Sequence, residues 1–246
     1  MKILFSPSEA KNSSSSLAEI SENSFIFKEL YKERLKPLKA YNDFVNTASL
    51  KDLEKFFELK KEDDILAFKG DIFKAKTSMA ITRYSGVSYK YLDFASLDES
   101  AKEYVKNNTI IFSNLFGPIL AKDSITNYKF KQGAKLNNED IANFYKKTFS
   151  KALDEFLQDE EVLDLRASFY DKFYVPSKKF YTYKFFKDKK VLSHFAKAYR
   201  GLLLRIMAQN QVESNEALLS VLPKELRVID IKDSPKKTEV SIEILS

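Results

Sequence analysis

Short strand-like segments and long helical segments are interspersed along the 246 residues without a regular strand–helix–strand repeat. Runs of β-branched and other apolar residues predict buried strands at Lys2–Phe5, Thr109–Ser113 and Val162–Leu165. A doubly wound parallel sheet needs a regular repeat of strand and helix, whereas a mixed order is typical of α+β proteins. We therefore predict one α+β domain over residues 1–246, with a mixed sheet and surrounding helices.

Apolar periodicity and capping residues predict the positions of the helices and of two hairpins. A helical pattern covers Phe25–Phe57, and we expect Pro37 to break it and Ser49 with Asp52 to restart it. Further helices are expected over Leu97–Lys106, from Asn138 onward, over Phe195–Gln211 and over Ser214–Leu222. Two hairpins are expected from paired apolar alternations, at residues 179–193 and 227–245.

Composition excludes several classes of site. The chain has no cysteine, one histidine and five glycines, which excludes disulfides, thiolate metal sites and a cysteine nucleophile. It holds no glycine-rich nucleotide-binding motif, and a Ser-His-Asp triad would have to use His194. We predict no metal site and no cofactor. No apolar run is long enough for a signal peptide or a membrane span, so we expect a cytoplasmic protein that does not contact membranes.

Two segments combine cations with a favourable backbone for binding an anion. Lys69 and Gly70 follow the apolar run that begins at Ile65, which brings charge and an accessible backbone to one spot. Lys197 and Arg200 lie three residues apart, on one face near the start of a helix, beside His194. Cations there oppose the helix dipole, and a bound anion would offset that cost. We therefore predict that Lys69, Lys197 and Arg200 converge on one cleft.

Two further segments could contact phosphates. Residues 114–125 resemble the hairpin of a helix-hairpin-helix element, with Gly117 at one of its glycine positions, although Pro118 removes a donor. The alternative for this segment is a strand-to-helix turn with a Gly-Pro kink. Residues 128–133 alternate aromatic and cationic side chains, so a strand would present Lys129 and Lys131 on one face. The alternative is an edge strand protected by lysines.

Arg166 ends a predicted buried strand directly after Asp164 and Leu165. A cation in that position could clamp a phosphate or a carboxylate, or it could pair with Asp164 or Asp171. The net charge of +6, from 41 cations against 35 anions, is a weak indication of polyanion binding.

Five segments in matching order resemble the YaaA family of bacterial peroxide-stress resistance proteins. Residues 3–11 read ILFSPSEAK, residues 65–73 read ILAFKGDIF and residues 164–170 read DLRASFY. The two other blocks are residues 113–133, which include the hairpin-like segment, and residues 193–205, which include AKAYRG. The chain departs from the family pattern at Asn114 for glycine, Asn127 for proline, and Lys131 for glutamate. The last of these changes adds positive charge.

The resemblance implies resistance to hydrogen peroxide, limitation of damage by free iron, and binding of double-stranded or branched DNA through a basic cleft with a helix-hairpin-helix element. Our leading prediction is a DNA-binding protein of the peroxide-stress and DNA-repair response. No recognition helix for base readout is visible, so binding is expected to follow charge and shape. The predicted phosphate-contacting residues are Lys11, Lys69, Gly70, Gly117, Lys129, Lys131, Arg166, His194, Lys197 and Arg200.

Two alternatives remain open at this point. The first is an enzyme acting on a nucleotide or another phosphorylated small molecule, with Glu9, Asp71 or Asp123 as acid–base groups beside Lys69 and Arg166. A deep, closed pocket joining these residues would favour the enzyme, and an open groove would favour DNA. The second alternative is an iron-binding protein that uses the acidic pairs at residues 63–64 and 160–161, which lack a Glu-x-x-His pattern.

Overall fold

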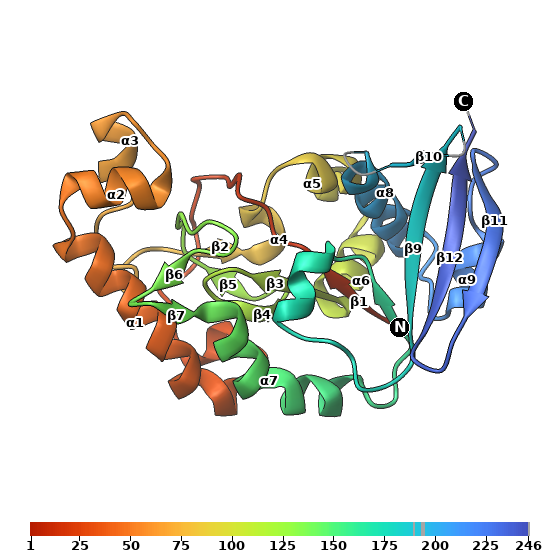
Figure 1. Ribbon diagram of the computed structural model, residues 1–246, viewed down its shortest axis with the longest axis horizontal. Helices are drawn as coiled ribbons and strands as arrows, with labels where there is room; N and C mark the ends of the chain where they lie inside the picture. Colours follow the sequence, from red (N-terminus) through yellow and green to blue (C-terminus); the bar gives the residue numbers. More distant parts are fainter. Residues whose placement is uncertain (189, 193–194, 246) are drawn as a thin grey trace.

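A mixed sheet of eight strands runs through the computed structural model, which describes residues 1–188, 190–192 and 195–245 (Figure 1). Seven strands follow one another in the order β11-β12-β9-β8-β1-β3-β4, and β10 pairs with β9. The strands are β1 (Lys2–Phe5), β3 (Thr109–Ser113), β4 (Gly117–Leu120), β8 (Val162–Asp164), β9 (Phe180–Lys187), β10 (Lys190–Val191), β11 (Leu226–Asp233) and β12 (Lys237–Ile244). Two small sheets pair β2 (Ser78–Met79) with β5 (Ser124–Ile125), and β6 (Lys135–Leu136) with β7 (Glu139–Asp140).

The central strands create a switch point in the sheet. Strand β1 is parallel to both of its neighbours, β3 and β8, and β8 is parallel to β9. The chain leaves β1 toward β3 on one side, whereas it leaves β8 toward β9 on the other side. Connections that diverge in this way open a crevice outside the carboxyl ends of the two strands, where ligands bind in open sheets of this kind.

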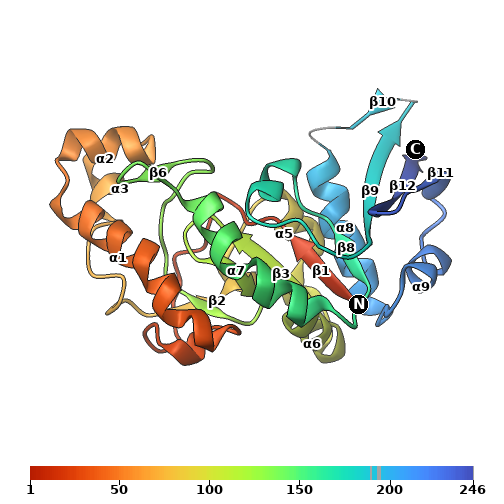
Figure 2. The ribbon, with the colours of Figure 1, turned by 60° about the horizontal axis from the view of Figure 1, so that its bottom comes forward.

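Helices cover both faces of the sheet. Figure 2 shows α7 crossing in front of the central strands beside α1, while α5 and α8 lie behind them. The helices are α1 (Tyr31–Thr47), α2 (Leu50–Phe57), α3 (Glu62–Leu66), α4 (Ala80–Arg83), α5 (Val87–Leu92), α6 (Glu99–Asn108), α7 (Ile141–Leu157), α8 (Ala196–Gln209) and α9 (Asn215–Ser220). Within the described residues, no helix has the length and apolar character to cross a membrane.

The predicted mixed α+β architecture is confirmed, and the main local error concerns Pro37. Helix α1 continues through this proline instead of breaking there. Pro37 belongs to the buried face of α1, together with Leu38, Tyr41 and Val45. Burial of that face against the core outweighs the lost backbone hydrogen bond, which costs about 3 kcal/mol in a helix interior. The expected restart is confirmed, because the Ser49 hydroxyl accepts a hydrogen bond from the Asp52 amide at 3.2 Å.

Residues 114–125 do not form a helix-hairpin-helix, which corrects that prediction. Strands β3 and β4 pair antiparallel on either side of a short turn, with Ser113 opposite Gly117. Gly117 has a φ of +69°, and a Cβ there would lie 2.3 Å from the Tyr145 ring. Gly117 is therefore required by a turn and by close packing inside the protein, and it presents no surface to a phosphate.

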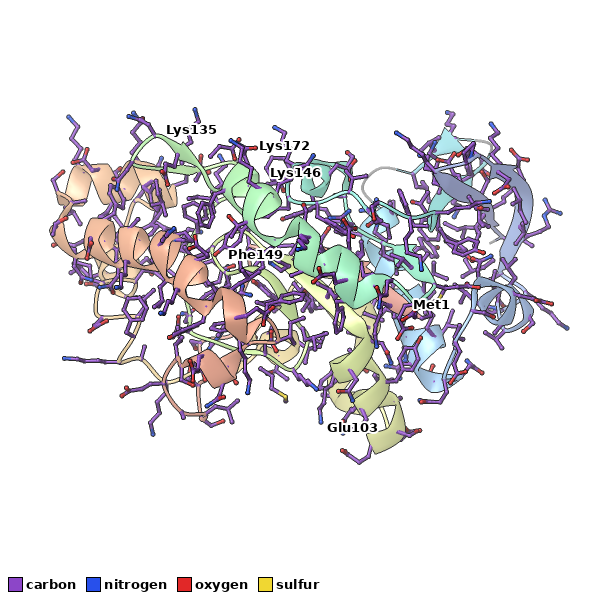
Figure 3. All side chains as sticks on the ribbon, turned by 90° about the horizontal axis from the view of Figure 1, so that it is seen from below. Met1, Glu103, Lys135, Lys146, Phe149 and Lys172 are labelled. Carbon is purple, nitrogen blue, oxygen red and sulfur yellow. The ribbon has the colours of Figure 1, made fainter. Side chains whose placement is uncertain are left out.

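Buried charged groups hold this hairpin against α1 and α7. Arg34 of α1 donates hydrogen bonds to the carbonyls of Phe116 and Pro118, and its guanidinium carbon lies 4.8 Å from the centre of the Phe149 ring. Figure 3 shows Phe149 on α7, pointing into the interior. Asp123 accepts hydrogen bonds from the amides of Ile26 and Leu120, at 3.2 and 2.9 Å.

The buried carboxyl group of Asp123 is expected to make the stability of the folded protein depend on pH. Burial raises the pKa of Asp123 to about 6, so the folded protein holds this proton more tightly than the unfolded chain does. The free energy of unfolding is therefore expected to fall by at most about 1.4 kcal/mol per pH unit as pH rises from about 4 to 6, and to level off above. Denaturant titrations of the wild type and of Asp123→Asn would check this. Identical pH profiles for the two proteins would contradict it.

Candidate functional site

A cavity of about 340 Å³ lies at the carboxyl ends of β1 and β8, at the switch point of the sheet. The segment that follows β1 forms one wall, and the segment that follows β8 contributes Leu165 and Ala167. Helices α5 and α8 close the cavity from the other side. The polar or charged side chains on its wall are Ser6, Ser8, Glu9, Ser88, Tyr89, Gln132, Tyr170, Lys197 and Arg200.

Hydrogen bonds and close packing fix these walls. The Ser6 hydroxyl accepts a hydrogen bond from the Ala167 amide at 2.9 Å, and the Tyr89 hydroxyl donates to the Ser6 carbonyl at 2.9 Å. Helices α5 and α8 approach so closely that a Cβ on Gly201 would lie 1.9 Å from the Ser88 carbonyl oxygen. This glycine therefore allows α8 to bring its first two turns to the cavity.

Lys197 and Arg200 share this cavity, as their spacing on one helix face predicted. Among the described residues, neither side chain has a carboxylate within 4.0 Å. Burial lowers the pKa of Arg200, while Asp164 partly opposes this effect. Two cations without a carboxylate partner, one of them half-buried, give this end of the cavity a net attraction for anions.

A second cavity of about 240 Å³ adjoins the first through Glu9. Its other lining residues are Lys11, Phe57, Glu58, Lys129, Phe130 and Lys131. The strip from Tyr128 to Lys131 alternates as predicted, because Tyr128 and Phe130 are buried while the two lysines face outward. The strip is extended but pairs with no strand in the described part of the chain, and Lys131 forms an ion pair with Glu58.

Lys11 is the most perturbed cation of the second cavity. Its Nζ lies 4.1 Å from the centre of the Tyr128 ring and 5.6 Å from that of Tyr84, and it donates to the Glu9 carbonyl at 3.2 Å. The pKa of Lys11 is lowered to about 7, mainly by burial and also by the nearby charges of Lys129 and Arg83, whereas Glu9 acts to raise it. The uncharged form of this amine is therefore more accessible at neutral pH than that of an exposed lysine.

Lys69 lines a third cavity, of about 250 Å³, with Ser15, Gly70, Asp71, Lys76 and Asn127 among its walls. It shares no lining residue with the cavity of Lys197 and Arg200. Of the three residues predicted to converge on one cleft, Lys197 and Arg200 share a cavity, whereas Lys69 lines a separate one. The reason is that Lys69 follows α3, which lies at one end of the molecule, whereas α8 lies beside α5 and β9, beyond the middle of the molecule (Figure 1).

The three cavities nevertheless follow the same two segments. The N-terminal segment lines the first cavity with residues 5–10, the second with residues 9 and 11, and the third with residue 15. The segment 127–132 lines the first cavity with residue 132, the second with residues 129–131 and the third with residue 127. The two segments thus run in opposite directions past one cavity after another. We call this arrangement the cation row, and its basic side chains are Lys11, Lys69, Lys76, Lys129, Lys131, Lys197 and Arg200.

Three other predicted anion contacts have different surroundings. The Gly70 amide donates to the Asn46 side chain at 3.0 Å, so its N–H is already used. Arg166 is 1% exposed and donates to both oxygens of Asp164, at 2.9 and 2.7 Å, which is the ion-pair alternative considered from the sequence. His194 lies outside the described residues. Asp123, an acid–base candidate of the enzyme alternative, is buried against backbone amides and lines none of the three cavities.

Charge is distributed unequally between the two ends of the central strands. A cavity at the amino ends of β1 and β8 is lined by Glu103, Asp159, Glu160, Glu161 and Glu213. Figure 3 shows Glu103 on α6 pointing away from Lys135, Lys146 and Lys172, which lie on the opposite side of that view. The carboxylates at the amino ends are partly paired, Glu160 with the Met1 amino group and Lys2, and Glu103 with Lys106, so of these two cavities the one at the carboxyl ends is the one with unpaired cations among the described residues.

Sequence reasoning missed the polar residues of the first cavity and the aromatic support of Lys11. Ser88 and Gln132 line the cavity but belong to no charged pattern, so nothing local marks them. The alternation of residues 128–133 predicts that Tyr128 is buried, but no local pattern relates Tyr84 or Tyr128 to Lys11. Within residues 1–188, 190–192 and 195–245, no group of three or more acidic or histidine side chains is arranged to hold a metal ion.

Comparison with known proteins gives the family. A family model described as "Peroxide stress protein YaaA" matches residues 1–229. An uncharacterized protein of Campylobacter jejuni is 56% identical over 245 residues, covering 100% of both chains. A UPF0246 protein of Fusobacterium nucleatum is 28% identical over 239 residues, covering 90% of each chain. The chain therefore belongs to the family of the peroxide stress protein YaaA.

Proposed function

We propose that this protein acts in the peroxide-stress response by binding double-stranded or branched DNA along the cation row, and that this binding helps limit iron-dependent oxidative damage to the DNA. The observation that carries the proposal is the presence of two or more cations in each of three successive cavities. Phosphates follow one another along a nucleic-acid strand, so a polymer gains from several separated cationic positions.

The extent of the row favours a polymer over a small ligand. The N-terminal segment lines the first cavity from residue 5 and the third at residue 15, and these two cavities share no lining residue. A single nucleotide would fill one cavity and leave the other cations unused. The described part of the chain places no helix across the row in the manner of a recognition helix, so the proposed binding follows charge and shape.

Three carboxylates also line the row, and each has a neighbouring group that weakens its repulsion of a phosphate. Glu58 pairs with Lys131, and an Asp71 carboxylate oxygen accepts a hydrogen bond from the Phe73 amide at 2.9 Å. Glu9 lies between the first two cavities, beside Lys11. Even without Lys11, whose positive charge is weakened by burial, six cations outnumber the three carboxylates, which supports binding of an anionic strand.

Duplex binding is expected to weaken steeply with salt. Neutralisation of about five phosphates gives a slope of log Kobs against log[salt] near −4 to −5. Fluorescence anisotropy with a labelled duplex and a labelled four-way junction, between 50 and 300 mM salt, measures this slope. No binding at 50 mM salt to either DNA would refute the proposal.

Single substitutions in the row are expected to act alike. Lys69→Ala, Lys129→Ala and Arg200→Ala should each weaken DNA binding about three- to tenfold and reduce the salt slope by about one. The matched control is Lys151→Ala, because Lys151 is 89% exposed on α7, outside the row. Equal affinities for the row variants and the control would contradict the proposal, as would a loss of affinity that a lowered melting temperature explains.

A second candidate function is an enzyme acting on a nucleotide or another phosphorylated small molecule. The specific observation in its favour is the cavity at the switch point, which combines Glu9 with Lys197 and Arg200. This function predicts that Arg200→Ala loses affinity for a nucleotide while Lys69→Ala, in the far cavity, keeps it. Isothermal titration of both variants with nucleoside phosphates, beside the DNA measurements, separates the two functions.

A further inference from the structure

We propose that Lys11 is a nucleophilic amine that forms an imine with an aldehyde carried next to a phosphate group. The inference rests on the proposed phosphate-binding function of the cation row and adds a covalent step to it. Two sources supply such an aldehyde, namely an abasic site in a DNA strand and a small phosphorylated aldehyde.

The position of the Lys11 amine is the first support. Its Nζ lies over the Tyr128 ring and close to that of Tyr84, and among the described residues no carboxylate lies within 4.0 Å of it. Its hydrogen bond to the Glu9 carbonyl uses one donor position. The amine also lines the second cavity, so a ligand in the row can reach it. A structural lysine would be expected to pair with a carboxylate or extend into water.

The aromatic support is itself held rigidly. The Tyr84 and Tyr128 hydroxyls are hydrogen-bonded at 2.8 Å, and the Tyr128 hydroxyl is hydrogen-bonded to the Ser113 hydroxyl at 2.8 Å. The backbone of Lys11 pairs with that of Tyr84 in an isolated bridge. These contacts fix both rings and the base of the Lys11 side chain, which places the amine in one position relative to the cavity.

The charges around Lys11 favour its uncharged form. The groups that face it are Lys129, Arg83 and Glu9, together with the rings of the two tyrosines. Two cations and burial act against the ammonium form, whereas one carboxylate and the faces of the two rings stabilise it. An amine that is partly unprotonated at neutral pH is nucleophilic, as lysines that form Schiff bases must be.

The covalent step balances without an added oxidant or reductant. The lone pair of the neutral Lys11 Nζ attacks the aldehyde carbon and gives a carbinolamine. Loss of the hydroxyl group and of the remaining amine proton as one water molecule leaves the C=N bond of the imine. Lys129 on the neighbouring strip is placed to hold the adjacent phosphate, because it lines the same cavity.

Borohydride trapping tests the inference with the full-length protein. One arm uses a duplex with a single abasic site, and the other uses glyceraldehyde 3-phosphate. Borohydride adds hydride to the imine carbon, so that the C=N bond becomes a stable secondary amine, and mass spectrometry of peptides locates it. We expect an adduct on Lys11 in at least one arm, with a trapping rate that rises between about pH 6 and 8.

Two variants separate chemistry from folding. Lys11→Arg keeps a long basic side chain but removes the nucleophile, and should lose at least tenfold in trapped product. Lys151→Arg is the matched control, because Lys151 is exposed on α7 outside the cation row, and it should keep its trapping on Lys11. An adduct on other lysines only, or no adduct in either arm, would overturn the inference.

The outcomes also distinguish this inference from the proposed function. Normal duplex binding with no Lys11 adduct would remove the imine and leave DNA binding intact. A Lys11 adduct with the small aldehyde, in a protein that binds no duplex, would instead support the lysine chemistry and refute the proposed DNA function. A melting temperature of Lys11→Arg within a few degrees of the wild type confirms that the variant is folded.

Discussion

Replacing Asp164 with alanine is expected to lower the free energy of unfolding by about 3–5 kcal/mol, the cost typical of removing one partner from a buried ion pair. Asp164 ends β8, and its two carboxylate oxygens accept hydrogen bonds from Arg166. The Arg166 side chain is 1% exposed, so the variant would leave its charge buried without this partner. Chemical denaturation followed by circular dichroism measures the loss.

The same pair also positions the cavity at the switch point. Arg166 donates to the carbonyls of Tyr170 and Tyr174 at 3.1 and 3.0 Å, which folds the segment after β8 back on itself. This segment carries Ala167 and Tyr170, which line the cavity. We therefore expect Asp164→Ala to weaken DNA binding as well, although Asp164 does not line the cavity.

Two controls sharpen this prediction. Asp171 lies 3.8 Å from Arg166 but is 58% exposed, so Asp171→Ala should change the free energy of unfolding by less than about 1 kcal/mol. The double variant Asp164→Leu with Arg166→Met removes both charges and should recover a large part of the stability. A single Asp164→Ala variant as stable as Asp171→Ala would show that the buried pair contributes little.

Substituting Gly201 with valine is expected to destabilise the protein by about 3 kcal/mol or more. A Cβ at this position would lie 1.9 Å from the Ser88 carbonyl oxygen and 2.8 Å from its carbonyl carbon. Both are backbone atoms of α5, which cannot rotate away, so the two helices must separate. Overpacking of this kind typically costs 1–3 kcal/mol. Valine also fills more space than alanine does.

Gly201→Ala is the more informative variant, because alanine stabilises a helix interior by about 1 kcal/mol relative to glycine. A loss of stability in that variant can then only come from the contact with α5. The control is Gly133→Ala, where the Cβ would meet only the Phe169 ring, at 3.6 Å, and the cost comes from the positive φ of 78°. A Gly201→Ala variant more stable than the wild type would refute the close approach.

Separation of α5 from α8 should also affect binding. Ser88 lines the cavity from α5, and Lys197 and Arg200 line it from α8. We expect Gly201→Ala to weaken DNA binding more than Gly133→Ala does, even at a temperature where both variants are fully folded.

The local elements of this fold could be predicted from the sequence because their signals are local. Strand β3 occupies the residues predicted, and β1 does as well. Helix α6 begins at Glu99 instead of Leu97, because the Asp98 carboxylate is the cap that accepts from the Ala101 amide at 2.8 Å. The alternation after Tyr128 correctly gave its buried and exposed faces, since a side chain's face depends only on its place in an extended segment.

The sequence by itself therefore determined most of the strands and helices, the mixed α+β class and the family. Only the tertiary structure decided which cations share a cavity, that Arg166 is paired with Asp164, that Pro37 stays inside a helix, and that Lys11 lies over two tyrosine rings. Lys11 and Tyr128 are 117 positions apart, so no local pattern relates them. Their contact follows from long-range packing, in which burial of the core outweighs local preference and sets the charge state of the amine.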